Sequence, residues 1–235
     1  MQTRLVLFGF LFCSVVFCGL FVCEPAACSA VKPHTISFGK WTNVKWFTGP
    51  DEATVSELKV RPLYIDGRLR EYVLNTPHDI TERLFVIRRA FRINDNLPEE
   101  RPVATRWIWQ RGGWILVDRF AGHISTINFT GFDPYYSNGE WYRDYFAFCS
   151  LTEDGKKILA IVEELGRRKS VVKQPLGEFA GNGAADSACA TPTWQRQPAR
   201  VTFQSSSGQK FSFTLRGQVA GEIYPAQEDD RDDSK

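Results

Sequence analysis

The sequence predicts an all-β protein, and three observations support that fold class. Hydrophobic side chains alternate with a period of two along most of the chain, and glycine-containing dipeptides separate the alternating stretches. These stretches are rich in β-branched and aromatic residues, which are typical of strands. With 235 residues, of which 43% are hydrophobic and 24% charged, the chain is long enough for one sizeable core.

The first 30 residues differ from the rest and indicate a secretory signal. Arg4 is their only basic residue, and no charged residue lies between positions 5 and 23. Small residues follow Pro25, and we expect cleavage after Ala30. Two alternatives stay open: an uncleaved anchor formed by the apolar run, or a lipidated Cys28, whose preceding residues resemble a bacterial lipobox. Each predicts export, to the periplasm or beyond the cell, and the cleaved form would keep no stable membrane span.

Residues 31–227 form the predicted single all-β domain, and residues 228–235 a predicted disordered acidic tail. Five of the eight tail residues are acidic and none is apolar, so the tail has nothing to bury. The domain holds 26 of the 29 Lys and Arg and 21 of the 27 Asp and Glu, a net charge of +5. This mild charge favours no nucleic-acid partner.

Two of the six cysteines, Cys149 and Cys189, lie outside the predicted leader. An even pair in an exported protein predicts one disulfide, which would close a loop of about 40 residues. Two buried free thiols are the alternative. No C-x-x-C motif occurs, which excludes the common redox and zinc-knuckle patterns.

Tight turns define the predicted strands in chain order. Four hairpins are expected: 60–65 with 69–74 across Asp66-Gly67, 106–110 with 114–119 across Gly112-Gly113, 146–151 with 157–163 across Asp154-Gly155, and 201–204 with 210–215 across Ser207-Gly208. A further turn follows the first three hairpins, at Thr76-Pro77-His78, Ala121-Gly122-His123 and Leu165-Gly166-Arg167. The second glycines of the hairpin turns are 46, 42 and 53 residues apart. Each unit is therefore predicted to run strand, turn, strand, turn, strand.

One stretch, residues 158–168, also fits a helix. Ile158, Ile161, Val162 and Leu165 have the spacing of one helix face. The hairpin repeat places the same residues in a strand, and we favour the strand.

A period of about 45 residues built from antiparallel strands is typical of propeller blades, because one small sheet covers its faces only by stacking on neighbours. Residues 114–124, and residues 137–141 followed by 154–157, resemble the outer part of a WD-type blade over about 80 residues. The resemblance implies a propeller-like stack of blade-like repeats. A β-sandwich or a barrel is the alternative, since the fourth unit lacks its final strand. Residues 177–198, rich in Gly and Ala, are predicted to form a surface loop that carries Cys189.

The densest aromatic segment, residues 129–148, contains the predicted binding site. Nine of its twenty residues are Phe, Tyr or Trp, interleaved with acidic and amide side chains. Sugars bind such surfaces because their C–H faces stack on rings while polar side chains bind the hydroxyls. Several rings of the strand are expected in the core, so the binding site is assigned to the loop: Phe132, Asp133, Tyr135, Tyr136 and Trp141.

No common catalytic or nucleotide-binding motif occurs in the sequence. Three histidines, His34, His78 and His123, are 44 and 45 residues apart, so a closed propeller would place them at equivalent positions around a metal. Each follows a turn-forming Pro or Gly, and we therefore expect turn histidines, with no metal site and no cofactor.

The resulting hypothesis is an exported, non-enzymatic binding or scaffold domain that presents aromatic-rich loops to a protein or glycan. The alternative is an exported hydrolase of glycosidase or esterase type that uses carboxylates near residues 132–144. Candidate acid pairs are Asp133 with Glu140, and Glu163 with Glu164. The basic groups Arg88-Arg89-Arg92 and Arg167-Arg168-Lys169 are expected to point from strands into water.

Overall fold

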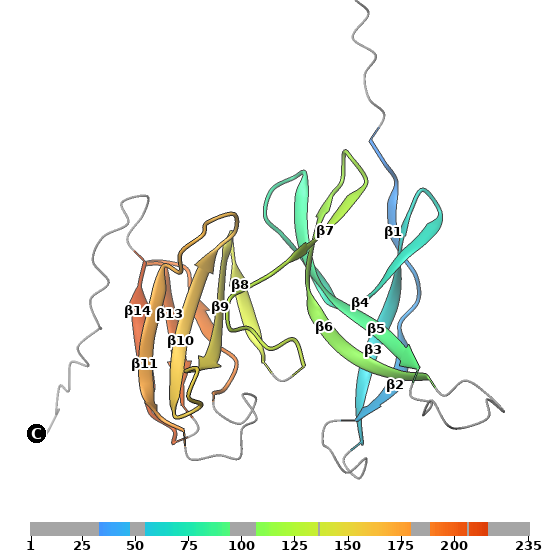
Figure 1. Cartoon of the computed structure of the whole chain (residues 1–235). Coiled ribbons are helices and arrows are strands. Elements are labelled where there is room, and N and C mark those ends of the chain that lie inside the picture. Colours follow the sequence, from blue (N-terminus) through green and yellow to red (C-terminus); the bar gives the residue numbers. More distant parts are fainter. Residues whose placement is uncertain are drawn as a thin grey trace, which may run out of the picture. The chain divides into compact units, whose positions relative to one another are not determined.

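The structure is a computed structural model that describes residues 33–47, 55–94, 107–135, 137–179, 189–205 and 207–215. Across these ranges the chain forms strands and turns with no helix, which confirms the predicted all-β class (Figure 1). In the same ranges, no helix is long and apolar enough to cross a membrane. The predicted leader, the acidic tail and Tyr136 lie outside the described residues.

The largest sheet has seven strands: β1 (Ile36–Phe38), β2 (Thr42–Phe47), β3 (Val55–Ile65), β4 (Arg68–Asp79), β5 (Leu84–Asn94), β6 (Trp107–Asp118) and β7 (His123–Ile127). Strands β2 to β6 pair antiparallel in the order β2–β3–β4–β5–β6. A parallel pairing of Trp46 with Trp109 then joins β6 back to β2, so the pairings form a closed, ring-like circuit. β1 pairs with β3, and β7 pairs with β6.

Apolar clusters cover both faces of this sheet. One cluster takes side chains from all five strands of the circuit: Val44, Leu58, Val60, Tyr72, Leu74, Ala90 and Trp109. Another contains Leu63, Val73, Phe85, Ile87, Ile115 and Val117. The neighbours Val86 and Ile87 on β5 are both fully buried, although they point to opposite faces. The middle of β5 is therefore an interior strand.

The remaining strands form two smaller sheets. Four strands pair in the order β11–β10–β9–β8: β8 (Gly139–Tyr142), β9 (Tyr145–Leu151), β10 (Lys157–Glu164) and β11 (Val172–Glu178). The other three pair in sequence: β12 (Thr193–Gln195), β13 (Arg200–Gln204) and β14 (Lys210–Thr214). One core unites them, with Ala160 and Val162 from β10 and Phe203 and Phe213 from the three-stranded sheet.

The predicted disulfide is confirmed. Cys149 on β9 is bonded to Cys189, which lies just before β12 and forms an isolated bridge with Ser205. Both half-cystines belong to the core that the two small sheets share. The disulfide therefore fixes the start of the three-stranded sheet to the middle of the four-stranded one.

A fourth cluster, the aromatic junction, connects the large sheet with the four-stranded sheet. Trp114 on β6, Trp141 on β8 and Phe146 on β9 meet there, together with Phe129 from the segment after β7. The rings of Phe129 and Phe146 stack with centroids 4.6 Å apart, and Trp114 meets Trp141 edge-on at 5.6 Å. Most rings of the dense aromatic segment are thus used for packing.

Three of the four predicted hairpin turns are confirmed. Asp66 and Gly67 both have positive φ, 52° and 75°, as a two-residue hairpin turn with glycine requires. Asp154-Gly155 joins β9 to β10, and Ser207-Gly208 joins β13 to β14. Residues 157–164 form β10 and the strand ends there, so the predicted strand is confirmed over residues 158–164, and the helix considered for residues 158–168 is wrong.

The hairpin predicted at Gly112-Gly113 is wrong, because β6 runs straight through both glycines. A Cβ on Gly112 would lie 3.0 Å from the carbonyl oxygen of Arg89, beside a register shift between β5 and β6. Glycine here permits a close approach of two backbones and not a turn. The turn predicted at Thr76-Pro77-His78 is also wrong, since β4 continues to Asp79 through a bulge.

The propeller-like stack is not confirmed. The strands group into sheets of seven, four and three, which does not follow a repeat of about 45 residues. The repeat depended on the turn at Gly112-Gly113, and without that turn the second unit merges with the first in one large sheet.

Candidate functional site

The candidate site is a groove of about 810 Å³ where residues of all three sheets meet. His78 and Asp79 enter it from the end of β4. Residues 140–143, from β8 and the turn after it, form a second side. Residues 191–194 and Arg196, around β12, form the third.

An aromatic pair closes one side of the groove. The rings of Tyr142 and Trp194 stack with their centroids 5.3 Å apart and their planes 26° apart. The indole N–H of Trp194 donates to the carbonyl oxygen of Glu140 at 3.0 Å, and the Tyr142 hydroxyl donates to the carbonyl oxygen of Arg196 at 3.3 Å. These reciprocal bonds tie β8 to the segment around β12.

His78 connects the large sheet to the same groove. Its ring stacks on Trp141 with centroids 5.9 Å apart, and its Nε2 lies 2.8 Å from the carbonyl oxygen of Arg143. Because a carbonyl only accepts hydrogen bonds, Nε2 carries a proton and donates it. The β8–β9 turn is therefore anchored from β4.

Two acids, Asp79 and Glu140, line the groove, and their surroundings differ. The Asp79 carboxylate accepts a hydrogen bond from Arg119 at 2.6 Å, so an arginine outside the groove compensates its charge. Partial burial raises the pKa of the Glu140 carboxyl above its ordinary value, and nearby His78 opposes that shift. Arg143 and Arg196 form no ion pair with any residue that the structure describes.

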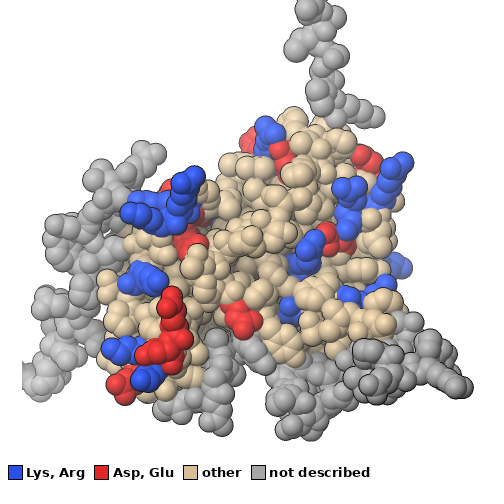
Figure 2. Space-filling view, in the orientation of Figure 1, with Lys and Arg blue, Asp and Glu red and all other residues tan. Residues whose placement is uncertain are grey.

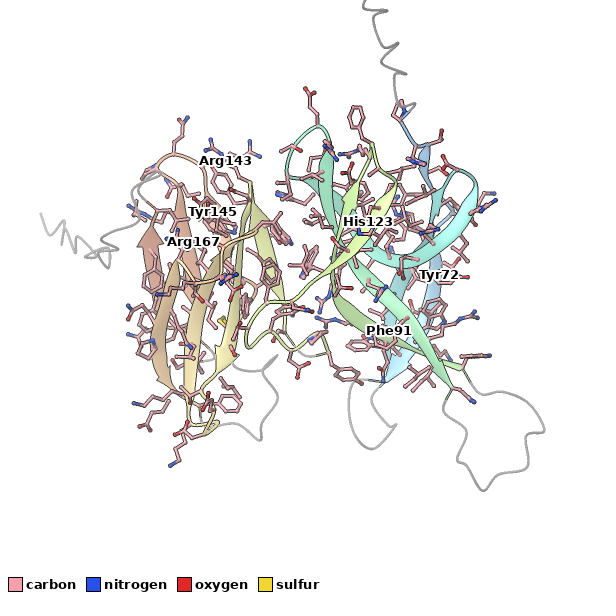
Figure 3. The ribbon with its side chains drawn as sticks, turned by 45° about the horizontal axis from the view of Figure 1, so that its top comes forward. Tyr72, Phe91, His123, Arg143, Tyr145 and Arg167 are labelled. Carbon is pink, nitrogen blue, oxygen red and sulfur yellow. A yellow bond between two sulfur atoms is a disulfide. The ribbon has the colours of Figure 1, made fainter. Side chains whose placement is uncertain are left out.

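Arg143 has an unusual backbone for its residue type. Tyr142 pairs with Tyr145, so Arg143 and Asp144 form a two-residue turn, in which Arg143 has a φ of 54°. This left-handed region favours glycine, because a Cβ crowds the backbone there. The Arg143 guanidinium lies 5.4 Å from the ring centre of Tyr142, and Figure 3 shows Arg143 at the tip of the β8–β9 hairpin.

The residues of the predicted binding site do not converge on this groove. Trp141 lines it but is only 6% exposed, because most of its ring packs in the aromatic junction. Phe132 packs edge-on against Phe148 at 5.3 Å, and Tyr135 lies 5.3 Å from Trp46. The Asp133 carboxylate accepts a hydrogen bond from the backbone N–H of Tyr135.

The predicted acid pairs are not brought together as catalytic pairs. Glu140 lines the groove, whereas Asp133 does not. Glu163 and Glu164 are neighbours on β10 and so point to opposite faces of the sheet. Glu164 pairs with Arg167 at 3.0 Å, and Glu163 accepts a hydrogen bond from Ser170.

The prediction that the arginines of β5 point into water is wrong for two of the three. Arg88 is 5% exposed and donates hydrogen bonds to backbone carbonyls. Arg89 forms a partly buried ion pair with Glu71. Arg92 is exposed, and its guanidinium lies within 6 Å of the rings of Tyr72, Trp107 and Trp109.

The three histidines have different surroundings. His34 contacts the Asp66 carboxylate at 2.6 Å, His78 lines the groove, and His123 begins β7. Among the described residues, no three His, Cys, Asp or Glu side chains are arranged to hold a metal ion.

Trp141 is the groove residue that the predicted binding site contains, Glu140 was predicted as a candidate acid, and His78 as a turn histidine. Arg143, Trp194 and Arg196 were not predicted as site residues, and they come from two segments of the chain. Comparison of the chain with protein-family models, with curated proteins and with solved structures finds no match.

Proposed function

We propose that the chain is an exported, non-enzymatic binding domain and that its groove binds a glycan. The observation that carries this proposal is the stacked pair of Tyr142 and Trp194 beside a row of polar groups. Carbohydrate ligands combine apolar C–H faces with many hydroxyls, so they need a ring surface next to donors and acceptors.

The polar groups of the groove fit the hydroxyls of a sugar. Thr191 and Thr193 are exposed and offer hydroxyls that both donate and accept. Glu140 accepts, and the two arginines donate. Because hydrogen bonds already join the walls, the groove is formed before a ligand arrives, which reduces the entropy lost on binding.

Trp194 provides the test of this proposal. A glycan array first identifies a ligand, and calorimetry then measures its affinity for the wild type and for Trp194→Ala. We expect the substitution to lower the affinity about tenfold or more, because it removes the ring surface. Trp194→Phe, which keeps a ring but loses the N–H bond to Glu140, is expected to retain part of the affinity.

Trp107→Ala is the matched control, because Trp107 is 52% exposed and does not line the groove. Its affinity should equal that of the wild type. Equal affinities for the wild type and Trp194→Ala would exclude the groove as the glycan site. An array without any bound glycan would exclude glycan binding, and the groove would then be assigned to a protein ligand.

A hydrolase is the second candidate, and one observation favours it. Glu140 lies in the groove with a raised pKa, as a general acid needs. The discriminating measurement is turnover of the bound glycan by the wild type and by Glu140→Gln. Turnover that is lost in Glu140→Gln would make the protein an enzyme, whereas binding without turnover supports the binding domain.

Export is tested at the N-terminus of the protein purified from its host. We expect the intact mass of a chain that begins at Val31, because a signal peptidase requires the small residues before that position. A mass that begins at Met1 would support the uncleaved anchor, and a lipid adduct on Cys28 would support the lipoprotein. Either result would contradict cleavage after Ala30.

A further inference from the structure

We propose that the glycan in this groove is anionic and that Arg143 and Arg196 together bind its carboxylate or sulfate group. This proposal rests on the proposed glycan-binding function and names the class of sugar. Both arginines line the groove and are exposed.

The charges of the groove leave these two cations uncompensated. Arg119 neutralises Asp79 from outside the groove, and neither Arg143 nor Arg196 has an acidic partner among the described residues. The remaining acid, Glu140, has a raised pKa because of partial burial. A ligand that brings a negative charge would therefore complete the ion pairing of the site.

The face of the molecule that Figure 2 shows carries charges of both signs. Lys and Arg are interspersed with Asp and Glu over the face shown in Figure 2, without a large area of one sign. A preference for an anion must then come from local side chains, and bidentate hydrogen bonds from guanidinium groups match carboxylate and sulfate oxygens.

Tyr142 connects the two arginines. Its ring faces the guanidinium of Arg143 at 5.4 Å, and its hydroxyl donates to the backbone carbonyl of Arg196 at 3.3 Å. The backbone carbonyl of Arg143 is held in turn by His78. The Arg143 side chain and the backbones of both arginines are thus attached to one assembly, which lowers the entropy lost when a ligand binds.

The backbone of Arg143 supplies an independent observation. Glycine would adopt its φ of 54° without strain, and yet an arginine occupies the position. Strained backbone persists where the surrounding structure enforces it, and it is concentrated at binding sites. A guanidinium at the tip of the hairpin is the property that glycine would not supply.

The experiment uses three matched saccharides and the full exported chain. The probes are hexagalacturonic acid, its methyl ester and a sulfated neutral oligosaccharide of similar length. We expect the free acid or the sulfated sugar to bind at least tenfold more tightly than the ester, with an affinity that falls as salt rises. Arg143→Gly and Arg196→Ala should each remove most of that difference, with a smaller loss of affinity for the ester, to which the two arginines donate hydrogen bonds but offer no ion pair.

Arg143→Gly also separates lost binding from lost folding. Because glycine fits the observed φ, the melting temperature of this variant should equal or exceed that of the wild type. Arg167→Ala is the control, because Arg167 lies in the neighbouring turn and already pairs with Glu164. This variant should bind all three sugars as the wild type does.

The outcomes are distinct. If the acid, the ester and the sulfated sugar bind equally, and Arg143→Gly changes nothing, the anionic class is wrong while glycan binding stands. If none of the three binds and the array is also empty, the proposed function fails together with this inference. Preference for the sulfated sugar over the uronic acid supports the inference and identifies sulfate as the anion.

Discussion

Arg88→Leu is expected to lower the free energy of unfolding by roughly 3 to 5 kcal/mol. Arg88 is buried on β5 and donates to the carbonyl oxygens of Gly112 at 3.2 Å, Pro134 at 2.8 Å and Ser137 at 2.9 Å. Leucine fills much of the same volume but donates no hydrogen bond. Buried carbonyl groups would lose their charged donor, and a buried polar group without a partner destabilises the fold.

Equilibrium unfolding in urea measures this loss, and Arg92→Leu is the matched control. Arg92 lies on the same strand but is exposed and contacts aromatic rings, so its loss should change stability by less than about 1 kcal/mol. Arg88→Lys keeps the charge but lacks the planar guanidinium group with its several donors, so its free energy of unfolding should lie between those of the wild type and Arg88→Leu. Equal stabilities for Arg88→Leu and Arg92→Leu would show that the buried hydrogen bonds contribute little.

The same substitution should also weaken ligand binding. Arg88 and Arg111 both bond to the carbonyl oxygen of Ser137, two residues before β8 begins. The two arginines therefore fix the chain that leads into Glu140, Trp141 and Tyr142. Loss of Arg88 would release this segment from the large sheet. Glu140, Trp141 and Tyr142 would then be held less firmly in the groove, even where the protein stays folded.

The sequence allowed the strands and most turns to be predicted because those signals are local. Asp66-Gly67 needs two residues with positive φ, and a dipeptide pattern shows that directly. Gly112-Gly113 shares the composition of such a turn, but its glycines serve a close contact with Arg89 on the neighbouring strand. A dipeptide does not show which strand lies beside it, so a glycine pair in a turn and a glycine pair in a close strand contact look alike in the sequence.

The burial of Arg88 was missed for a related physical reason. Alternation shows that neighbouring residues face opposite sides of a strand. It identifies the solvent-exposed face only when the other face is buried and apolar. On β5 both Val86 and Ile87 are fully buried, so both faces are covered near Arg88. An arginine in such a strand is expected to point into water unless its hydrogen-bond partners are known. The partners of Arg88 lie 24 to 49 residues away along the chain, so the local sequence does not show them.

The groove illustrates the same limit for the candidate site. Aromatic density favoured residues 129–148 as a binding segment, but of its described residues only 140–143 line the groove, and most of its rings pack in the aromatic junction. The opposite wall comes from Trp194, which is 54 residues from the carbonyl of Glu140 that it bonds to. A single sequence does not show which distant strand ends meet, so the groove was found only when the fold was known.

The disulfide was predictable because two cysteines remain after the predicted leader, and its removal should have an effect close to that of Arg88→Leu. The double variant Cys149→Ala/Cys189→Ala is expected to lose about 4 kcal/mol, since the bond closes a sequence separation of 40 residues. Chain-entropy theory assigns this loss to the unfolded state, which becomes freer without the link. Urea unfolding of the wild type with and without a reductant provides the comparison.

The reduced wild type should unfold at the same urea concentration as the double variant, and a reductant should leave the variant unchanged. A difference between the reduced wild type and the variant would mean that the substituted side chains, and not the covalent link, determine the loss. The disulfide is also expected to matter for binding. Cys189 precedes Thr191 by two residues, so the bond fixes the start of the groove side formed by residues 191–194 to β9. Reduction at urea concentrations that leave the fold intact should therefore weaken glycan binding, because the segment around Trp194 would lose its covalent link to β9 and keep only the hydrogen bonds to β8.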